Sequence, residues 1–177
     1  MNPVIEIQHL KKYFSSNKGV LHAVDDVSFS IEKGKTMGVV GESGCGKSTL
    51  GRTIIHLQES TDGKIFLNGE DITFLKGKNL PKHGKNADYF PGSLFLFESP
   101  YDGEDLIKEP LLVSRRYKSK AELEEQVTKL MDRVGVEKRL RNAYPHELDG
   151  GRRQRIGIAR ALALNPEFIV CDEPVSA

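Results

Sequence analysis

The chain has 177 residues, of which 38% are hydrophobic and 29% are charged, and its formal net charge is +1 at pH 7. This composition is typical of a single globular domain and excludes a disordered chain. The near-neutral charge gives no indication of binding to nucleic acid, and no apolar run approaches the roughly 18 residues that cross a bilayer.

The first part of the sequence combines short apolar strands with one helix. Strands are predicted over residues 4–7, 23–31, 36–40 and 63–67, and a helix over 48–57. The strand at 36–40 is β-branched and leads directly into a glycine-rich loop, and the helix follows that loop. Asn68-Gly69 after the last strand predicts a hairpin turn. A strand–loop–helix unit among further strands favours a mixed α/β fold.

The second part is predicted to be mainly helical. Residues 76–85 are polar and are expected to form a solvated loop, and residues 93–97 favour a buried strand. Ser119 and Glu122 have the spacing of a capping box, and Gly135 is expected to end the helix that follows. Its apolar stripe is interpreted as core packing. A second helix over 151–164 and a buried strand over 168–171 complete the prediction.

Targeting signals and disulfides are not expected. The N-terminus lacks a basic stretch followed by an apolar core, so no signal peptide is predicted. The two cysteines, Cys45 and Cys171, do not look like partners in a disulfide, which fits a reducing cytosol. Any membrane contact is therefore expected to come through a partner.

A phosphate-binding loop is the most specific motif, because residues 41–48 match the pattern G-x-x-x-x-G-K-[ST]. Glycines let backbone N–H groups approach a phosphate, and Lys47 places a positive charge beside it. Ser48 can coordinate Mg²⁺, and the helix start offers unpaired N–H groups to the anion. The sequence therefore predicts binding of a nucleoside triphosphate. The residues assigned to it are Gly41, Glu42, Ser43, Gly44, Cys45, Gly46, Lys47, Ser48 and Thr49.

Two carboxylates follow the predicted strand at 168–171. Asp172 is expected to hold Mg²⁺ through water, and Glu173 to polarise the attacking water. Acidic residues at a strand end are common and are weak evidence alone. Together with a phosphate loop they indicate a binding site, because α/β proteins bind ligands at the carboxyl ends of their strands.

A glycine pair precedes the arginine-rich helix. The segment consists of Leu148, Asp149, Gly150, Gly151 and Arg152. Two readings stay open: a second anion-binding helix end, or an ordinary helix start with Asp149 as its N-cap.

These three elements, in this order, resemble the ATP-binding domain of ABC transporters over essentially the whole chain. Finer matches resemble the ATPase subunits of dipeptide and oligopeptide importers, at residues 23–29, 41–52, 144–148, 157–166 and 172–177. The resemblance implies one domain over 1–177 with a P-loop NTPase (RecA-like) core. It also implies an N-terminal antiparallel β subdomain and a helical signature-motif subdomain over about 98–160.

The resemblance also implies roles and partners. Tyr13 would stack on adenine, and Glu98 would lie in the coupling loop and reach Mg²⁺. The signature motif at 148–152 would close over ATP held by a second ATPase subunit. Lys47 and Glu173 would be catalytic, with ATP and Mg²⁺ as cofactors. Permease subunits would hold the protein at the cytoplasmic side of the membrane, and an extracytoplasmic solute-binding protein would take part indirectly.

Four departures from the family pattern qualify this reading. Glu98 replaces a glutamine, the segment after Tyr101 is short, and Asp149 and Arg152 replace the signature serine and glutamine. The chain ends at Ala177, before the family's D-loop and switch histidine, so a C-terminally truncated domain is expected. A carboxylate about 4 Å from a phosphate costs on the order of 4 kcal/mol at an effective dielectric near 20.

Three functions remain in consideration. The first is the ATP-hydrolysing subunit of a peptide importer. The second is a nucleotide-binding but hydrolysis-poor regulatory or decayed subunit, which Glu98 and Asp149 favour. The third is a soluble ABC ATPase outside transport, which the absence of tandem domains or long insertions disfavours.

Overall fold

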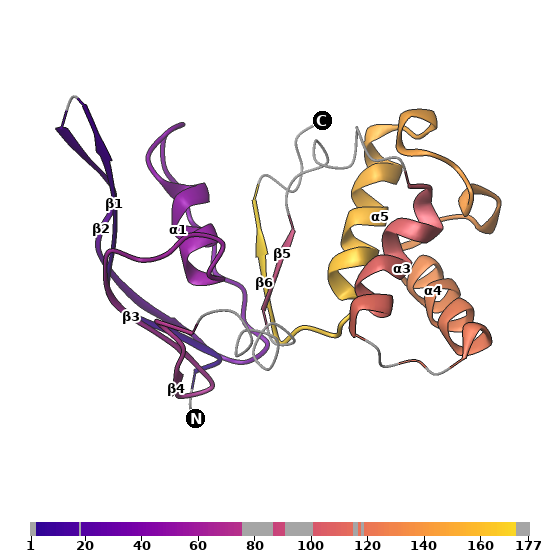
Figure 1. Cartoon of the computed structure of the whole chain (residues 1–177), viewed down its shortest axis with the longest axis horizontal. Coiled ribbons are helices and arrows are strands. Elements are labelled where there is room, and N and C mark those ends of the chain that lie inside the picture. Colours follow the sequence, from indigo (N-terminus) through magenta and orange to yellow (C-terminus); the bar gives the residue numbers. More distant parts are fainter. Residues whose placement is uncertain are drawn as a thin grey trace. The chain divides into compact units, whose positions relative to one another are not determined.

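The structure is a computed structural model that describes residues 3–17, 19–75, 101–114, 117 and 119–172, and the backbone alone of residues 87–90. The chain forms two compact units, Met1–Ala87 and Asp88–Ala177, which are described separately (Figure 1).

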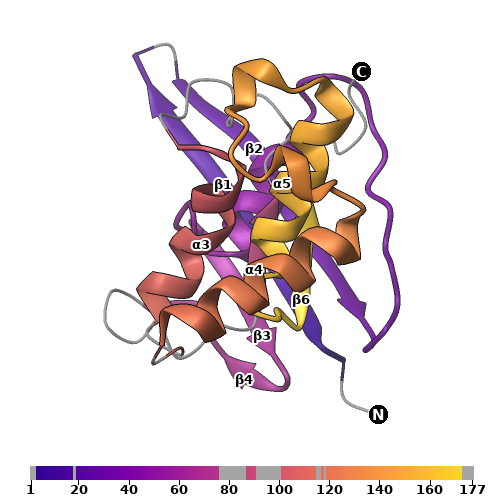
Figure 2. The ribbon, with the colours of Figure 1, turned by 90° about the vertical axis from the view of Figure 1, so that its right-hand side faces the viewer.

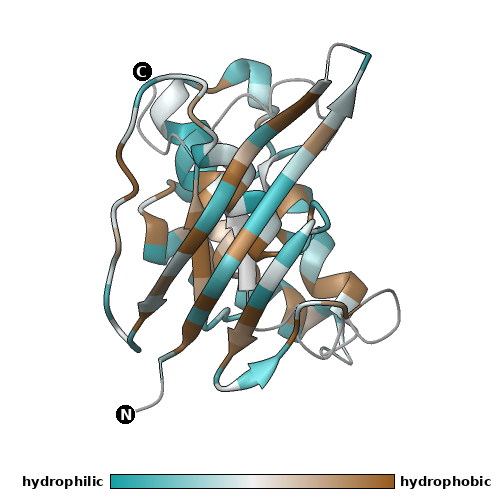
Figure 3. Cartoon of the chain, turned by 90° about the vertical axis from the view of Figure 1, so that its left-hand side faces the viewer, coloured by the Kyte–Doolittle hydropathy of each residue, from teal (hydrophilic) through white to brown (hydrophobic). Residues whose placement is uncertain are grey.

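The first unit is built on a four-stranded antiparallel sheet with strand order β2-β1-β3-β4. Its strands are β1 (Ile5–Ser16), β2 (Gly19–Ile31), β3 (Asp62–Leu67) and β4 (Glu70–Asp71). Ile5 on β1 pairs with Ile31 on one side and with Leu67 on the other. Hydrophobic and hydrophilic residues alternate along these strands (Figure 3), because successive side chains point to opposite faces of a sheet.

Helix α1 (Lys47–Ile54) follows the glycine-rich loop and contacts β1 and β2. Its buried residues are Leu50, Thr53 and Ile54; the last two follow Leu50 by three and four positions and therefore lie on the same face as Leu50. The Thr53 hydroxyl is fully buried and donates a hydrogen bond of 2.8 Å to the Thr49 carbonyl, which satisfies it without a partner outside the helix.

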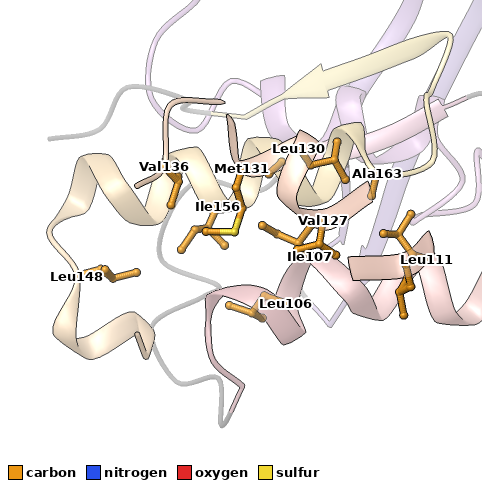
Figure 4. Packing of buried hydrophobic residues seen from close by; sticks show 12 residues of the cluster. Leu106, Ile107, Leu111, Val127, Leu130, Met131, Val136, Leu148, Ile156 and Ala163 are labelled. Atoms are coloured by element: carbon orange, nitrogen blue, oxygen red, sulfur yellow. The ribbon is translucent and has the colours of Figure 1, made fainter. Parts of the chain in front are cut away.

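The second unit contains three helices that contact one another, α3 (Gly103–Ser114), α4 (Lys120–Val134) and α5 (Gly150–Leu162) (Figure 2). Two short 3-10 turns, η3 (Lys138–Leu140) and η4 (Pro145–Glu147), connect α4 to α5. Strands β5 (Ala87–Phe90) and β6 (Phe168–Cys171) form a two-stranded sheet. Ile107, Val127, Met131 and Ile156 point toward one another in the core of the helices (Figure 4).

Polar contacts hold the helical unit at two places. Glu104 is buried and accepts hydrogen bonds from Arg141, one of them 2.8 Å from Nη2 to Oε1, and it also pairs with Lys108. These contacts hold the pKa of Glu104 below its usual range, with Arg141 as the largest cause. Arg155 on α5 donates to the carbonyls of Val134 and Gly135, at 3.3 and 3.0 Å, and so caps the end of α4.

Most predicted elements are confirmed, with shifted bounds. The Ser119 hydroxyl accepts a hydrogen bond from the Glu122 N–H, and Gly135 ends α4 in the left-handed conformation. Asn68 and Gly69 both have positive φ and connect β3 to β4, as the hairpin prediction requires. β6 is a strand, although its residues are half-buried or exposed rather than buried. The predictions for residues 76–85 and 93–97 lie outside the described residues.

Two predictions are wrong. Residues 36–40 do not form a strand: they lie outside the described sheets, and Val40 is 96% exposed. β-branched composition favours an extended backbone, but a strand also needs a neighbour to pair with. The segment after Tyr101, predicted as a loop shorter than that of the family, contains helix α3. Leu106, Ile107 and Leu111 supply its buried face, and this stripe outweighs the missing N–H of Pro110.

Candidate nucleotide-binding site

The glycine-rich loop owes its shape to two left-handed glycines. Gly44 has φ +79° and Gly46 has φ +96°, values that other residues rarely adopt. Gly46 also lies against β2: a Cβ atom placed on it would be 2.0 Å from the carbonyl oxygen of Ala23. The loop can therefore approach the sheet this closely only with glycine at position 46.

Helix α1 begins at this loop without a side-chain cap. Gly46 is its N-cap residue, no side chain caps it, and the first turn carries no acidic residue. Its N-terminal N–H groups and the positive end of its dipole are therefore suited to an anion.

Lys47 reaches back over the loop. Its Nζ donates to the carbonyl oxygens of Gly41 and Glu42, at 2.8 and 2.6 Å, and lies 3.8 Å from the Cys45 sulfur. Cys45 and Cys171 are both free and exposed. The loop thus concentrates one cation and several backbone groups at the start of α1.

Tyr13 on β1 lies opposite His22 on β2 and stacks on it, with ring centroids 3.9 Å apart and an interplanar angle of 20°. Its hydroxyl donates a hydrogen bond to the Asp25 carboxylate, and this bond is the largest reason why its pKa is raised to about 12. Sequence reasoning predicted Tyr13 and missed His22 and Asp25. The β1–β2 register that brings them together is not readable from motif spacing.

The glycine pair at 150–151 lies at the exposed start of α5. Asp149 is the N-cap: its Oδ1 accepts from the Arg152 N–H at 2.7 Å, and its Oδ2 accepts from Arg152 Nη1 at 2.9 Å. Arg152 also pairs with Glu137 at 3.6 Å, while Leu148 is buried. The structure therefore bears out the N-cap prediction, and it adds an ion pair that occupies the Asp149 carboxylate.

The remaining predicted residues belong to the second unit. Asp172 directly follows β6 and is half-buried, whereas Glu98 and Glu173 lie outside the described residues. Ser48 in the first unit and Asp172 in the second each carry a side-chain oxygen, the type of ligand that Mg²⁺ prefers. Among the described residues, no cluster of three or more His, Cys, Asp or Glu side chains could hold a metal ion by itself.

The helices in the described part of the chain are short or carry many polar residues. None of them is both long and apolar enough to span a bilayer.

The family model for ABC transporters matches residues 24–176. The chain is 46% identical over 181 residues to the oligopeptide transport ATP-binding protein OppF of Bacillus subtilis, covering 98% of this chain and 58% of that protein. It is 40% identical over 184 residues to the dipeptide transport ATP-binding protein DppF of Lactococcus lactis, covering 98% of this chain and 57% of that protein. The chain therefore belongs to the ABC transporter family, and it spans just over half the length of these relatives.

A solved structure supports the same fold. The dimeric, post-hydrolysis state of the ATP-binding cassette MJ0796, bound to ADP and phosphate, superposes with a TM-score of 0.87 at 26% identity. The likeness covers 96% of this chain and 74% of that one. The fold is thus the P-loop ABC ATPase fold, with an antiparallel sheet and a group of helices, as the sequence predicts.

Proposed function

We propose that the chain binds ATP with Mg²⁺ at residues 41–49 and hydrolyses it as the ATP-binding subunit of a peptide importer. The observation that carries this proposal is the start of α1, where Gly46 leaves the helix uncapped and Lys47 is folded over the loop. The similarity to the oligopeptide and dipeptide transport proteins supports the choice of peptides as cargo.

The proposed chemistry starts from the contacts of Lys47. The carbonyl oxygens of Gly41 and Glu42 hold its ammonium group at 2.8 and 2.6 Å, and β- and γ-phosphate oxygens would take their place. Charge neutralisation by Lys47 favours the transition state, in which negative charge spreads over the transferred phosphoryl group. Glu173 would position the attacking water.

The same proposal assigns residues to Mg²⁺ and to the adenine ring of ATP. Ser48 and Asp172, with Glu98, would hold Mg²⁺, which when bound neutralises charge on the triphosphate. Tyr13, half-buried on β1, would receive the adenine ring. Residues 41–49, including Ser43 and Thr49, would surround the phosphates.

The proposed assembly has two ATPase subunits, identical or different, on the cytoplasmic side of a membrane permease. Residues 148–152 of one subunit would face the ATP of the other, and the helices at about 98–160 would form a signature subdomain. An extracytoplasmic binding protein would deliver the peptide.

A second candidate is a subunit that binds ATP and hydrolyses it poorly. The ion pair between Asp149 and Arg152 favours it, because the carboxylate lies at the helix start where the family places a serine. A γ-phosphate approaching α5 would meet this negative charge.

Titration of the full chain with a fluorescent ATP analogue and Mg²⁺ tests the proposal. Replacing Lys47 with alanine should weaken binding roughly tenfold or more, because a charge-assisted contact to phosphate is lost. Lys35→Ala, at an exposed turn of the same unit, is the matched control and should bind like the parent. Equal affinity of the Lys47 variant and the control contradicts the proposal, and phosphate release by the parent separates the two candidates.

A further inference from the structure

Three side chains on β1 and β2 form a connected cluster whose members are Tyr13, His22 and Asp25. Tyr13 and His22 lie opposite each other in the strand pairing, and their rings stack at 3.9 Å. The Asp25 carboxylate contacts both rings: Oδ1 accepts from the Tyr13 hydroxyl, and Oδ2 lies 3.4 Å from His22 Nδ1. One carboxylate therefore restrains both aromatic side chains.

The His22 ring covers one face of Tyr13 and is nearly parallel to it. Tyr13 is only half-buried, so part of its ring is accessible to a ligand. The hydroxyl bond to Asp25 holds the outer end of the Tyr13 ring in place, and the nearly parallel His22 ring restrains its plane before any ligand arrives. Such an arrangement suits a flat aromatic partner, because aromatic rings gain most from stacking when the platform is held in place.

The cluster borders the phosphate loop. Ala23 lies between His22 and Asp25 on β2, and its carbonyl oxygen is the atom that Gly46 approaches so closely. A triphosphate in the loop would therefore carry its nucleoside toward this part of β2. All of these residues belong to the first unit, so their arrangement does not depend on the second.

We propose that His22 and Asp25 are positioning residues that hold Tyr13 as a stacking platform for the base of a nucleotide. The platform makes the site prefer a nucleoside triphosphate over a bare triphosphate chain. This inference rests on the proposed function, in which Tyr13 receives the base, and it adds the two residues that define the orientation of the ring.

A similar pair on the same strands provides a matched control. His9 Nδ1 lies 2.8 Å from Asp26 Oδ1, and both side chains are largely exposed. This pair repeats the histidine–aspartate chemistry of His22 and Asp25, but neither member stacks on Tyr13 or bonds to its hydroxyl among the described contacts. Its removal therefore controls for general effects on the hairpin.

The experiment measures the affinity of the full chain for MgATP and, separately, for inorganic tripolyphosphate with Mg²⁺. His22→Ala and Asp25→Ala should weaken MgATP binding about threefold to tenfold and leave tripolyphosphate binding unchanged. His22→Phe should restore MgATP binding, because it keeps the stacked ring. His9→Ala and Asp26→Ala should bind both ligands like the parent.

The variant Tyr13→Ala tests whether His22 acts through Tyr13. In Tyr13→Ala, the further change His22→Ala should have no additional effect on MgATP affinity, because coupled residues are not additive. Unchanged MgATP affinity in His22→Ala and Asp25→Ala, or equal losses for MgATP and tripolyphosphate, would overturn the inference alone. A parent chain that binds neither ligand would overturn the proposed function as well.

Discussion

The starts of α1 and α5 are built in opposite ways. α1 begins after Gly46 with no capping side chain and no acid in its first turn. α5 begins after Asp149, whose carboxylate caps the Arg152 N–H and pairs with the Arg152 guanidinium. The first helix start is open in the sense that no side chain caps it, and it suits an external anion; in the second, closed start, the Asp149 side chain caps the Arg152 N–H.

This difference shows that a pair of glycines does not by itself make an anion site. Gly150 and Gly151 are exposed, and a Cβ on Gly151 would lie 3.6 Å from Asp149 Oδ1, the carboxylate oxygen that caps the helix end. At Gly46 the glycine is instead required by a left-handed backbone and by contact with Ala23. The residue at the N-cap decides which ligand a helix start can accept.

The largest expected effect is on the open helix start. Gly46→Ala should lower the free energy of unfolding by about 3 kcal/mol, because it combines an unfavourable φ with a collision against a backbone oxygen. ATP binding should be lost with it. Urea denaturation and nucleotide titration measure both.

Gly44→Ala is the control for this change. Gly44 also has positive φ, but no atom lies within 4 Å of the position that a Cβ would take there, so an added methyl group would displace nothing. The substitution should cost only about 1 kcal/mol. Equal costs at positions 44 and 46 would show that the contact with Ala23 is not important.

A smaller effect is expected in the unit that carries α5. Glu104→Gln should destabilise the helical unit by about 2 kcal/mol, because it leaves Arg141 and Lys108 without their shared carboxylate; partial exposure of Arg141 reduces the cost. Urea denaturation measures the loss. Glu125→Gln, which breaks an exposed pair with Lys129, should change stability by a few tenths of a kcal/mol.

The same carboxylate predicts a pH dependence. The fold lowers the pKa of Glu104 below its ordinary value of 4.5, so ionised Glu104 stabilises the fold above that pH. This contribution should be lost as the pH falls through the lowered pKa, and the acid-unfolding curve of Glu104→Gln should lack it. Parallel curves for the parent and the variant below pH 4.5 would contradict this assignment.

Apart from the control substitutions, the smallest expected effect concerns the closed helix start. Asp149→Ser keeps an N-cap and removes a negative charge, so ATP turnover should rise about tenfold if residues 148–152 face a γ-phosphate. Phosphate release by the full chain is the measurement. An unchanged turnover in Asp149→Ser would contradict the hypothesis that the Asp149 carboxylate weakens ATP hydrolysis at residues 148–152.

Sequence reasoning succeeded where chemistry is local. The glycine-rich loop that leads into a helix, the Ser119 cap and the Asn68-Gly69 turn depend on residues within a few positions of one another, and each was predicted. It failed where the outcome depends on partners far along the chain. Residues 36–40 have strand composition and no strand partner among the described residues, and helix α3, which contains Pro110, was not predicted.

The candidate site divides in the same way. Lys47 and Asp149 were identified from motifs, but the contacts of Lys47 with backbone carbonyls and the ion pair of Asp149 with Arg152 were not. The Tyr13–His22 stack depends on the pairing register of β1 with β2. This register shifts more than once between Ile7 and Tyr13. Irregularities of this kind are not visible in alternation of polar and apolar residues.

The contact between Gly46 and Ala23 has a consequence for sequence variation. Ala23 contributes its carbonyl oxygen, which every amino acid possesses, while Gly46 contributes the absence of a side chain, which only glycine offers. The contact therefore places no demand on the side chain at position 23, whereas it requires glycine at position 46. The two residues of one atomic contact can thus differ in their tolerance to substitution as widely as a surface residue and a core residue do.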